Sequence, residues 1–213
     1  MANNFTFGTH SFVSWNTVRN GTGVSYIAGS SLNITANVTL YAQWNLSTQT
    51  ISFLQPVPMR VGSPVQPLEA AATSGLPVSY TSITPLICTV VNGTRLSYVH
   101  SVAPGACTIE ATQLGSTAIT AANPVQQTFT ILAANDARVI LIIDPNGGSF
   151  TTNRTTYFNS FGIVLSANTT YTLPAATNVN YAHLAWAQGD INGASITSPY
   201  QVTADTIIVA KWS

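Results

Sequence analysis

The stretch "NITANVTLYAQW" (residues 33–44) is an alternating, strand-like run that ends on tryptophan. The last such run of the chain, "QVTADTIIVAKW" (residues 201–212), ends in the same way. When the two closing tryptophans are aligned, three more identities coincide: Thr35 with Thr203, Ala36 with Ala204, and Ala42 with Ala210. The chain contains only four tryptophans, so two near-copies that each end on one indicate a repeated unit.

The residues before each closing strand also correspond. "SFVSW" ends at Trp15 and "AHLAW" ends at Trp186, and the distances to the closing tryptophans are 29 and 26 positions. We therefore predict one unit at residues 1–45, a copy of it at residues 138–213, and a different domain at residues 48–133 between them. The polar linkers "NLSTQ" and "AANDA" are short, so we expect the two copies and the middle domain to form a semi-rigid row.

The first copy is shorter than the second. About 48 residues lie between Arg138 and Trp186, whereas only fourteen precede Trp15. The front half of the first unit is therefore missing, and the interpretation we favour is that the start of the sequence cuts it off. The alternative is that another subunit supplies the missing strands, because an unpaired sheet edge is a template for pairing. On that alternative, copies of the chain would associate with one another through the incomplete unit.

The local signals are those of a mainly β protein. Helical periodicity is nearly absent, and short runs rich in Val, Ile, Thr, Tyr and Phe alternate with turn residues. In the middle segment these runs are "TISFL", "VSYTS", "ICTVV", "RLSYV", "CTIEAT" and "QQTFTIL". "VILII" (residues 139–143) is typical of a buried strand, and "DPNGG" (residues 144–148) predicts a hairpin turn to the next strand at residues 150–158.

Composition excludes several classes of partner. Charged residues make up 6% of the chain and the net charge is zero. Nucleic-acid binding needs clustered positive charge, so we expect no nucleic-acid partner. No apolar run approaches the roughly 20 residues that span a bilayer, so we expect no membrane insertion in this segment. The first residues, "MANNFTFGTH", lack the basic and apolar regions of a signal peptide.

Cys88 and Cys107 lie 19 positions apart. A disulfide that closes a loop of this size would stabilise the fold by about 3 kcal/mol. The alternative is a pair of buried free thiols, as in a reducing compartment. The low charge and the abundance of Thr and Asn favour an extracellular or cell-surface setting and therefore the disulfide.

Residues 138–213 contain "IIDPNGGSF", "TLPAAT", "YAHLAW" and "TADTIIVAKW". In these phrases the repeated unit resembles the Listeria–Bacteroides repeat, also called the internalin-type B repeat. That family has an Asn-Gly-Gly turn, an aromatic-x-Gly-Trp middle and a closing T-x-x-A-x-W. The sequence departs from it at Ala185 and Ser14, which replace the Gly before the first tryptophan of each copy. The resemblance implies small β-grasp-like domains.

The middle segment contains "QTISF", "SGLPVSYTSITPLICTV" and "APGACTIEATQLGSTAITAANPVQQTFTI". It resembles the bacterial Ig-like repeats of secreted and surface proteins. The resemblance implies a sandwich of about seven strands with the two cysteines on separate strands. The expected architecture is thus an Ig-like β-sandwich between two β-grasp-like modules, the first truncated.

Candidate catalytic and metal-binding groups are few. His10, His100 and His183 fall in different units, without the spacing of metal ligands. The six carboxylates lie in turns or singly in strands, which does not fit paired acid–base catalysis. "GDINGAS" (residues 189–195) resembles a calcium loop but lacks most of its acidic ligands, so we interpret it as a polar turn. We predict no enzyme activity, no cofactor, and no catalytic or metal site.

The four tryptophans allow two interpretations, a sugar-stacking platform or core residues. Because they occupy the recurring positions of the repeated unit, we expect them in the core. The leading hypothesis is a non-catalytic stalk, spacer or adhesive-fibre segment of an extracellular or cell-surface protein. The alternatives are a module that binds glycan or a cell-surface protein, and an accessory region of a secreted hydrolase.

Overall fold

The computed structural model describes residues 5–8, 10–93, 96–152, 155–157 and 159–213. Every regular element in this part of the chain is a β-strand, which confirms the predicted mainly β fold. The described residues contain no helix that could cross a membrane. The strands fall into three groups along the chain, and no sheet combines strands from two of them.

The first group, called here the N-terminal sheet, has three antiparallel strands in the order β2-β1-β3. Their bounds are β1 (Phe12–Asn16), β2 (Ser25–Tyr26) and β3 (Tyr41–Trp44). The central strand β1 carries the buried Trp15, and β3 ends on Trp44 as the sequence predicts.

The second group, the middle strands, builds two facing layers around one core. One layer has the order β5-β12-β11-β8 and the other contains β6-β10-β9, and β4 and β7 form a separate two-stranded sheet. Their buried faces contribute to a single apolar cluster that includes Leu68, Val99, Ile109 and Phe129. The bounds are β4 (Ile51–Phe53), β5 (Met59–Arg60), β6 (Gln66–Leu68), β7 (Ala70–Ala72), β8 (Ser79–Ser82), β9 (Cys88–Val91), β10 (Ser97–Ser101), β11 (Gly105–Thr112) and β12 (Val125–Leu132).

The third group, the C-terminal strands, is organised on a five-stranded sheet of order β16-β13-β22-β19-β20. Two smaller sheets, β15-β14-β18 and β17-β21, complete it and share a second buried cluster around Leu141, Phe150 and Trp186. The bounds are β13 (Arg138–Asp144), β14 (Ser149–Thr152), β15 (Thr155–Tyr157), β16 (Phe161–Ser166), β17 (Thr169–Tyr171), β18 (Ala176–Thr177), β19 (His183–Gln188), β20 (Ser195–Ile196), β21 (Tyr200–Val202) and β22 (Thr206–Trp212).

The turn after β13 is correctly predicted, but the hairpin is not. Asn146 and Gly147 adopt positive φ angles of 45° and 79°, and the Asp144 carboxylate accepts the Asn146 N–H. β13 does not pair with β14, however; it pairs with β16 and in parallel with β22. The chain changes sheet at this turn, because both edges of the apolar β13 are already occupied in the larger sheet, by β16 and β22.

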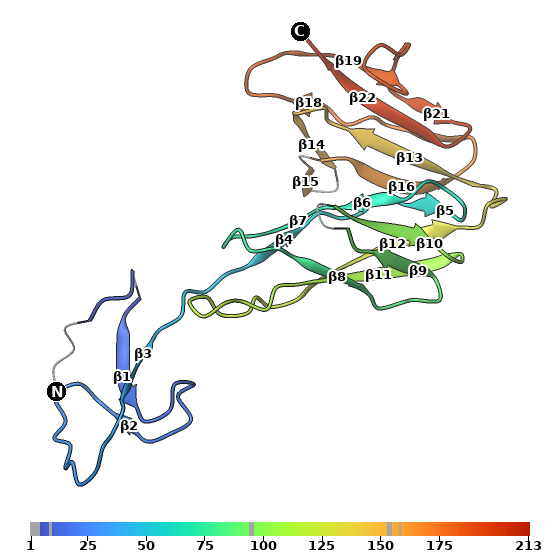
Figure 1. Ribbon diagram of the computed structural model, residues 1–213. Coiled ribbons are helices and arrows are strands. Elements are labelled where there is room, and N and C mark those ends of the chain that lie inside the picture. The colour runs from blue at the N-terminus through green and yellow to red at the C-terminus, as the bar shows by residue number, and fades with distance from the viewer. Residues whose placement is uncertain (1–4, 9, 94–95, 153–154, 158) are drawn as a thin grey trace.

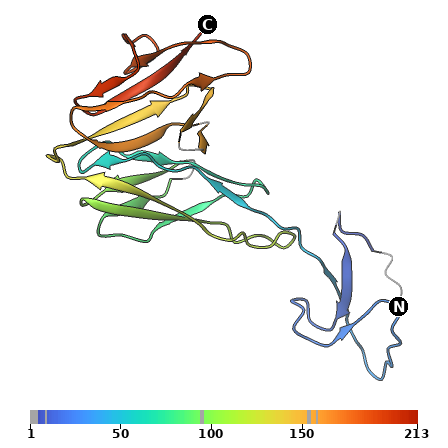
Figure 2. The ribbon, with the colours of Figure 1, turned by 180° about the vertical axis from the view of Figure 1, so that it is seen from behind.

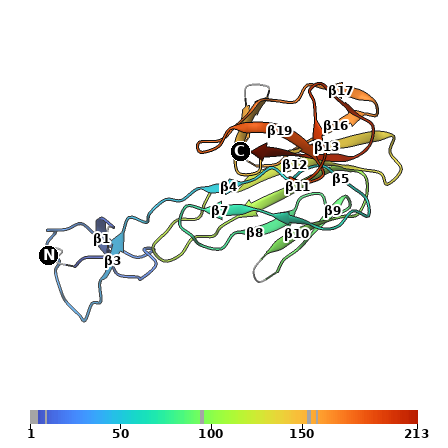
Figure 3. The same cartoon turned by 90° about the horizontal axis from the view of Figure 1, so that it is seen from above.

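Two of the three groups of strands lie against each other, and the third stands apart. Figure 1 shows the N-terminal sheet standing apart at the end of an extended segment, while the C-terminal strands lie against the middle strands. The view from behind shows the same separation (Figure 2). From above, the N-terminal sheet again projects at one end of the molecule (Figure 3).

Candidate functional site

The histidines are distributed as the sequence predicts, one in each group of strands. His10 precedes β1, His100 lies on β10, and His183 begins β19. Within the described part of the chain, no three His, Cys, Asp or Glu side chains are grouped so that they could hold a metal ion.

Most of the carboxylates are held by hydrogen bonds or ion pairs to groups that are close to them in space. Five of the six are engaged by neighbouring groups: Asp136 by Arg138, Asp205 by Arg60, Asp144 by the Asn146 N–H, Asp190 by the Asn192 N–H, and Glu110 by Gln126. The Asp190 contact closes a polar turn in the stretch that resembles a calcium loop. The sixth, Glu69, lines a surface pocket.

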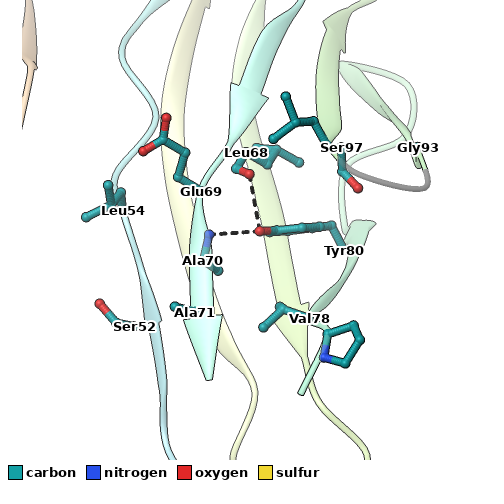
Figure 4. A pocket seen from close by; sticks show the side chains of 12 residues that line it. Ser52, Leu54, Leu68, Glu69, Ala70, Ala71, Val78, Tyr80, Gly93 and Ser97 are labelled. Atoms are coloured by element: carbon teal, nitrogen blue, oxygen red, sulfur yellow. Dashed lines mark hydrogen bonds between the residues drawn. The ribbon is translucent and has the colours of Figure 1, made fainter. Parts of the chain in front are cut away.

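That pocket, of about 610 Å³, lies over the break between β6 and β7. Figure 4 shows the Tyr80 ring reaching this break from β8. Its hydroxyl donates to the Leu68 carbonyl (3.2 Å) and accepts the Ala70 N–H (2.8 Å). Burial raises the pKa of Tyr80. Tyr80 thus satisfies the backbone where the strand is interrupted, and Glu69 is the one acid among the residues that line the pocket.

Cys88 and Cys107 are joined by a disulfide. Cys88 lies on β9 in one layer of the middle strands and Cys107 on β11 in the other, and both are fully buried. The bond therefore crosses the core and links the two layers.

The tryptophans differ in burial. Trp15 and Trp186 are buried, whereas Trp44 and Trp212 are half-buried. The prediction that all four tryptophans lie in the core is thus correct for Trp15 and Trp186. It is too strong for Trp44 and Trp212. Trp212 lies over the Asn-Gly-Gly turn: its indole N–H donates to the Asn146 carbonyl (2.9 Å), and a Cβ on Gly148 would meet its ring at 2.3 Å.

The two outer sheets pair their strands in the same register. In the N-terminal sheet Trp15 is opposite Ala42, and in the C-terminal sheet Trp186 is opposite Ala210. The neighbouring pairs also correspond: Phe12–Trp44 with His183–Trp212, Ser14–Gln43 with Ala185–Lys211, and Asn16–Tyr41 with Ala187–Val209. Both ladders contain an irregularity at the same place, one residue after Phe12 and one after His183.

The next strand and the ring contacts correspond as well. β2 places Tyr26 opposite Trp15, as β20 places Ile196 opposite Trp186. Phe12 contacts Trp15 and Trp44 with ring centroids 5.3 and 5.6 Å apart. His183 takes the same place between Trp186 and Trp212, at 5.2 and 5.4 Å.

Arg60 connects the middle and C-terminal strands. Its guanidinium forms a two-point contact with Asp205, with N–O distances of 2.5 and 2.8 Å. The remaining side-chain donor contacts go to three backbone carbonyls, those of Ala133 (3.2 Å) and Asp136 (3.1 Å) in the linker and that of Arg138 (2.6 Å) at the start of β13. The Asp205 carboxylate also accepts the Ile140 N–H at 2.9 Å. The Arg60 side chain thus ties the linker to both the middle strands and the C-terminal strands.

The charges at this junction stabilise one another. The hydrogen bond from Arg60 holds the pKa of Asp205 below its usual value, and the same bond raises the pKa of Arg60. Within the linker, the hydrogen bond from Arg138 lowers the pKa of Asp136 to about 2. Sequence reasoning missed Arg60, because its partner Asp205 lies 145 positions away. The only feature of the sequence that could have drawn attention to Arg60 was the small number of charged residues.

The linker to the N-terminal sheet is anchored in a different way. Ser47 forms a parallel bridge with Ile119, in which the Ser47 N–H donates to Ala118 (3.0 Å) and its carbonyl accepts from Thr120 (2.9 Å). The buried Gln49 adds hydrogen bonds to Gln113 (2.6 Å) and the Thr120 carbonyl (2.8 Å). These contacts pin the end of the linker to a loop of the middle strands.

No family model matches this chain, and a search of curated proteins finds no match either. Function is therefore inferred from the geometry of the chain itself.

Proposed function

We propose that the chain is a non-catalytic segment of a modular extracellular or cell-surface protein, in which it acts as a stalk or spacer or as part of an adhesive fibre. Its modules are residues 1–45, 48–133 and 138–213. The outer two are copies of one β-grasp-like repeat, a proposal supported by their matching strand registers. The middle one is an Ig-like sandwich, and its disulfide is compatible with an extracellular location.

The observation that carries this proposal is the construction of the junctions. A spacer must transmit orientation along its length, and a free linker between modules would not do so. Here every guanidinium contact of Arg60 is directed at the junction between the middle and C-terminal strands, and Ser47 ties the other linker to a loop. The low content of charged residues, 6% of the chain, fits a chain that needs no steering of a charged substrate.

Small-angle scattering of the full chain tests the spacer role. We expect an elongated particle whose scattering curve agrees with the arrangement in Figure 1 and does not change with ionic strength. A compact globule, or a profile that needs an ensemble of widely different orientations of the C-terminal strands, would contradict it.

A second candidate function, glycan binding, is favoured by one surface. A hollow of about 420 Å³ is lined by the exposed Tyr181 and the half-buried Trp212 together with Asn178 and Asn180. Aromatic faces can stack on sugar rings, and amides can bond to their hydroxyls. A glycan array probed with the native chain and with Tyr181→Ala tests it: binding lost in the variant would support recognition at this surface, and no bound glycan would contradict it.

A further inference from the structure

The first and last strands of the C-terminal group are direct neighbours and run in the same direction. β13 pairs in parallel with β22, with Leu141–Asp144 opposite Thr206–Val209. On its other edge each strand has an antiparallel neighbour, β16 beside β13 and β19 beside β22. The path of the chain through this group therefore begins on one central strand of the larger sheet and ends on the strand next to it.

Side chains lengthen this parallel contact at both of its ends. Just before β22, the Asp205 carboxylate accepts the Ile140 N–H at 2.9 Å. Just after β13, the Asn146 side-chain amide donates to the Ala210 carbonyl at 3.1 Å. The Asn146 carbonyl also accepts the Trp212 indole N–H at 2.9 Å. Cross-links between the two strands therefore run from Asp205 to Ala210 without a gap, with a further one at Trp212.

One face of the parallel contact is closed to water. Leu141, Ile143 and Ile208 are fully buried in the core of the C-terminal strands. A hydrogen bond that is stretched in contact with water can be exchanged for a bond to a solvent molecule. A bond beside buried side chains has no such substitute, so breaking it leaves unpaired groups and costs more.

The resistance of these cross-links to force depends on the direction of the force. A pull that draws the start of β13 backward and the end of β22 forward slides the two strands past each other. All the cross-links are then stretched together, and several must break in one step. A pull that separates the strands from one end breaks the same cross-links one after another. Forced unfolding is governed by the unfolding barrier, which is higher in the sliding direction.

We propose that the parallel contact of β13 with β22, called here the β13–β22 clamp, is a tension-resisting element that keeps the C-terminal strands folded when force acts along the chain. The inference rests on the proposed spacer role, because a spacer that is held at two points carries tension between them. It adds to that role the part of the fold that bears the tension and the direction in which it is strongest.

Single-molecule force measurements on the full chain compare two directions of pull on the same bonds. Handles on non-natural residues at the exposed Ala137 and Ser213 slide β13 past β22. Handles at Ala137 and the exposed Ala204 separate the two strands from the end where both begin. At equal force we expect unfolding to be about tenfold slower or more in the sliding direction, because several hydrogen bonds break together. Equal rates in the two directions would overturn the proposal.

Two asparagines at positive φ provide the decisive variant and its matched control. Asn146 and Asn168 have φ angles of 45° and 65°, which glycine adopts readily. Asn146→Gly removes the side-chain bond to Ala210 and should speed unfolding about fivefold in the sliding direction, as for one lost hydrogen bond. In the separating direction this cross-link breaks last, so we expect little change there.

Asn168→Gly makes the same chemical change at an exposed turn between β16 and β17, outside the clamp. It should leave both unfolding rates unchanged. Equal acceleration by the two variants in the sliding direction would contradict the clamp, since the effect would then come from the glycine and not from the lost cross-link.

The outcome is separable from that of the scattering test. A compact particle that still unfolds more slowly in the sliding direction would contradict the spacer role and support the clamp. An elongated particle that unfolds equally fast in both directions would overturn the clamp alone.

Discussion

Trp15 and Trp186 occupy the same position in two sheets and differ in one hydrogen bond. Both rings are buried, and only the Trp186 N–H has an acceptor among the described residues. Trp186→Ala should cost about 3–5 kcal/mol because it removes a large buried ring. Phe at each position keeps most of the ring, so Trp186→Phe should cost about 1 kcal/mol more than Trp15→Phe, the value of the lost bond.

Hydrogen exchange measured separately for peptides that contain β1 and β19 reports the two sheets in one experiment. The faster exchange should appear in β19 for Trp186→Phe, with a smaller change in β1 for Trp15→Phe. Equal losses at the two positions would show that the bond to Pro174 adds nothing.

His183 is a titratable group at a position that Phe12 occupies in the N-terminal sheet. Burial holds the pKa of His183 below its usual value near 6.5, although a backbone hydrogen bond at Ala185 partly opposes this. The unfolded chain therefore binds the proton more readily than the folded one. The free energy of unfolding should fall as the pH drops below about 6.5 and be fully recovered above it.

The matched variant is His183→Phe, which installs the residue of the other sheet. We expect it to keep the ring packing and to reduce the slope of stability against pH between 7 and 5 in urea titrations. An unchanged slope would assign that dependence to other groups.

At the scale of elements, the disulfide fixes β9 to β11 across the middle core. Loop-closure entropy for a separation of 19 positions corresponds to about 3 kcal/mol. The double variant Cys88→Ala, Cys107→Ala should lose about that much stability in urea unfolding. Reductant should lower the midpoint for the native chain and leave the double variant unaffected; an effect on both would point to another cause.

Sequence pattern located the strands that are long enough to show a period. The closing strands β3 and β22, the buried β13 and the six quoted runs of the middle segment are all found as strands. β5 has two residues and β7 has three, too few for alternation to be visible, and residues 70–72 are all alanine. A two-residue period cannot be read from such elements.

The pairing partners were harder to predict than the strands. The turn at residues 144–148 is set by local chemistry, and the sequence predicts it correctly. Which strand lies beside β13 is decided by β22, more than sixty positions later, so the predicted hairpin was wrong. The aligned tryptophans are the exception, because a repeated pattern carries its register with it.

At the scale of the whole molecule, the junction between the middle and C-terminal strands has two components. Arg60 and Asp205 form the polar one. The other is a close approach of β16 to the loop before β5, where a Cβ on Gly162 would lie 2.3 Å from Pro58. Glycine at this position lets the two backbones come together, so Arg60 acts at a contact that is already tight.

Arg60→Ala separates these two contributions. It leaves the Asp205 carboxylate and the carbonyls of Ala133, Asp136 and Arg138 without their common donor, so we expect a loss of about 1–3 kcal/mol. Distances between spin labels on non-natural residues at the exposed Ile83 and Ile191 should spread over a wider range than in the native chain. Arg138→Ala is the control, because it removes one exposed ion pair and should leave the free energy of unfolding nearly unchanged, without broadening. If Arg60→Ala keeps the narrow distribution, the packing of Gly162 on Pro58 holds the junction, and the orientation of the C-terminal strands depends on shape rather than on charge.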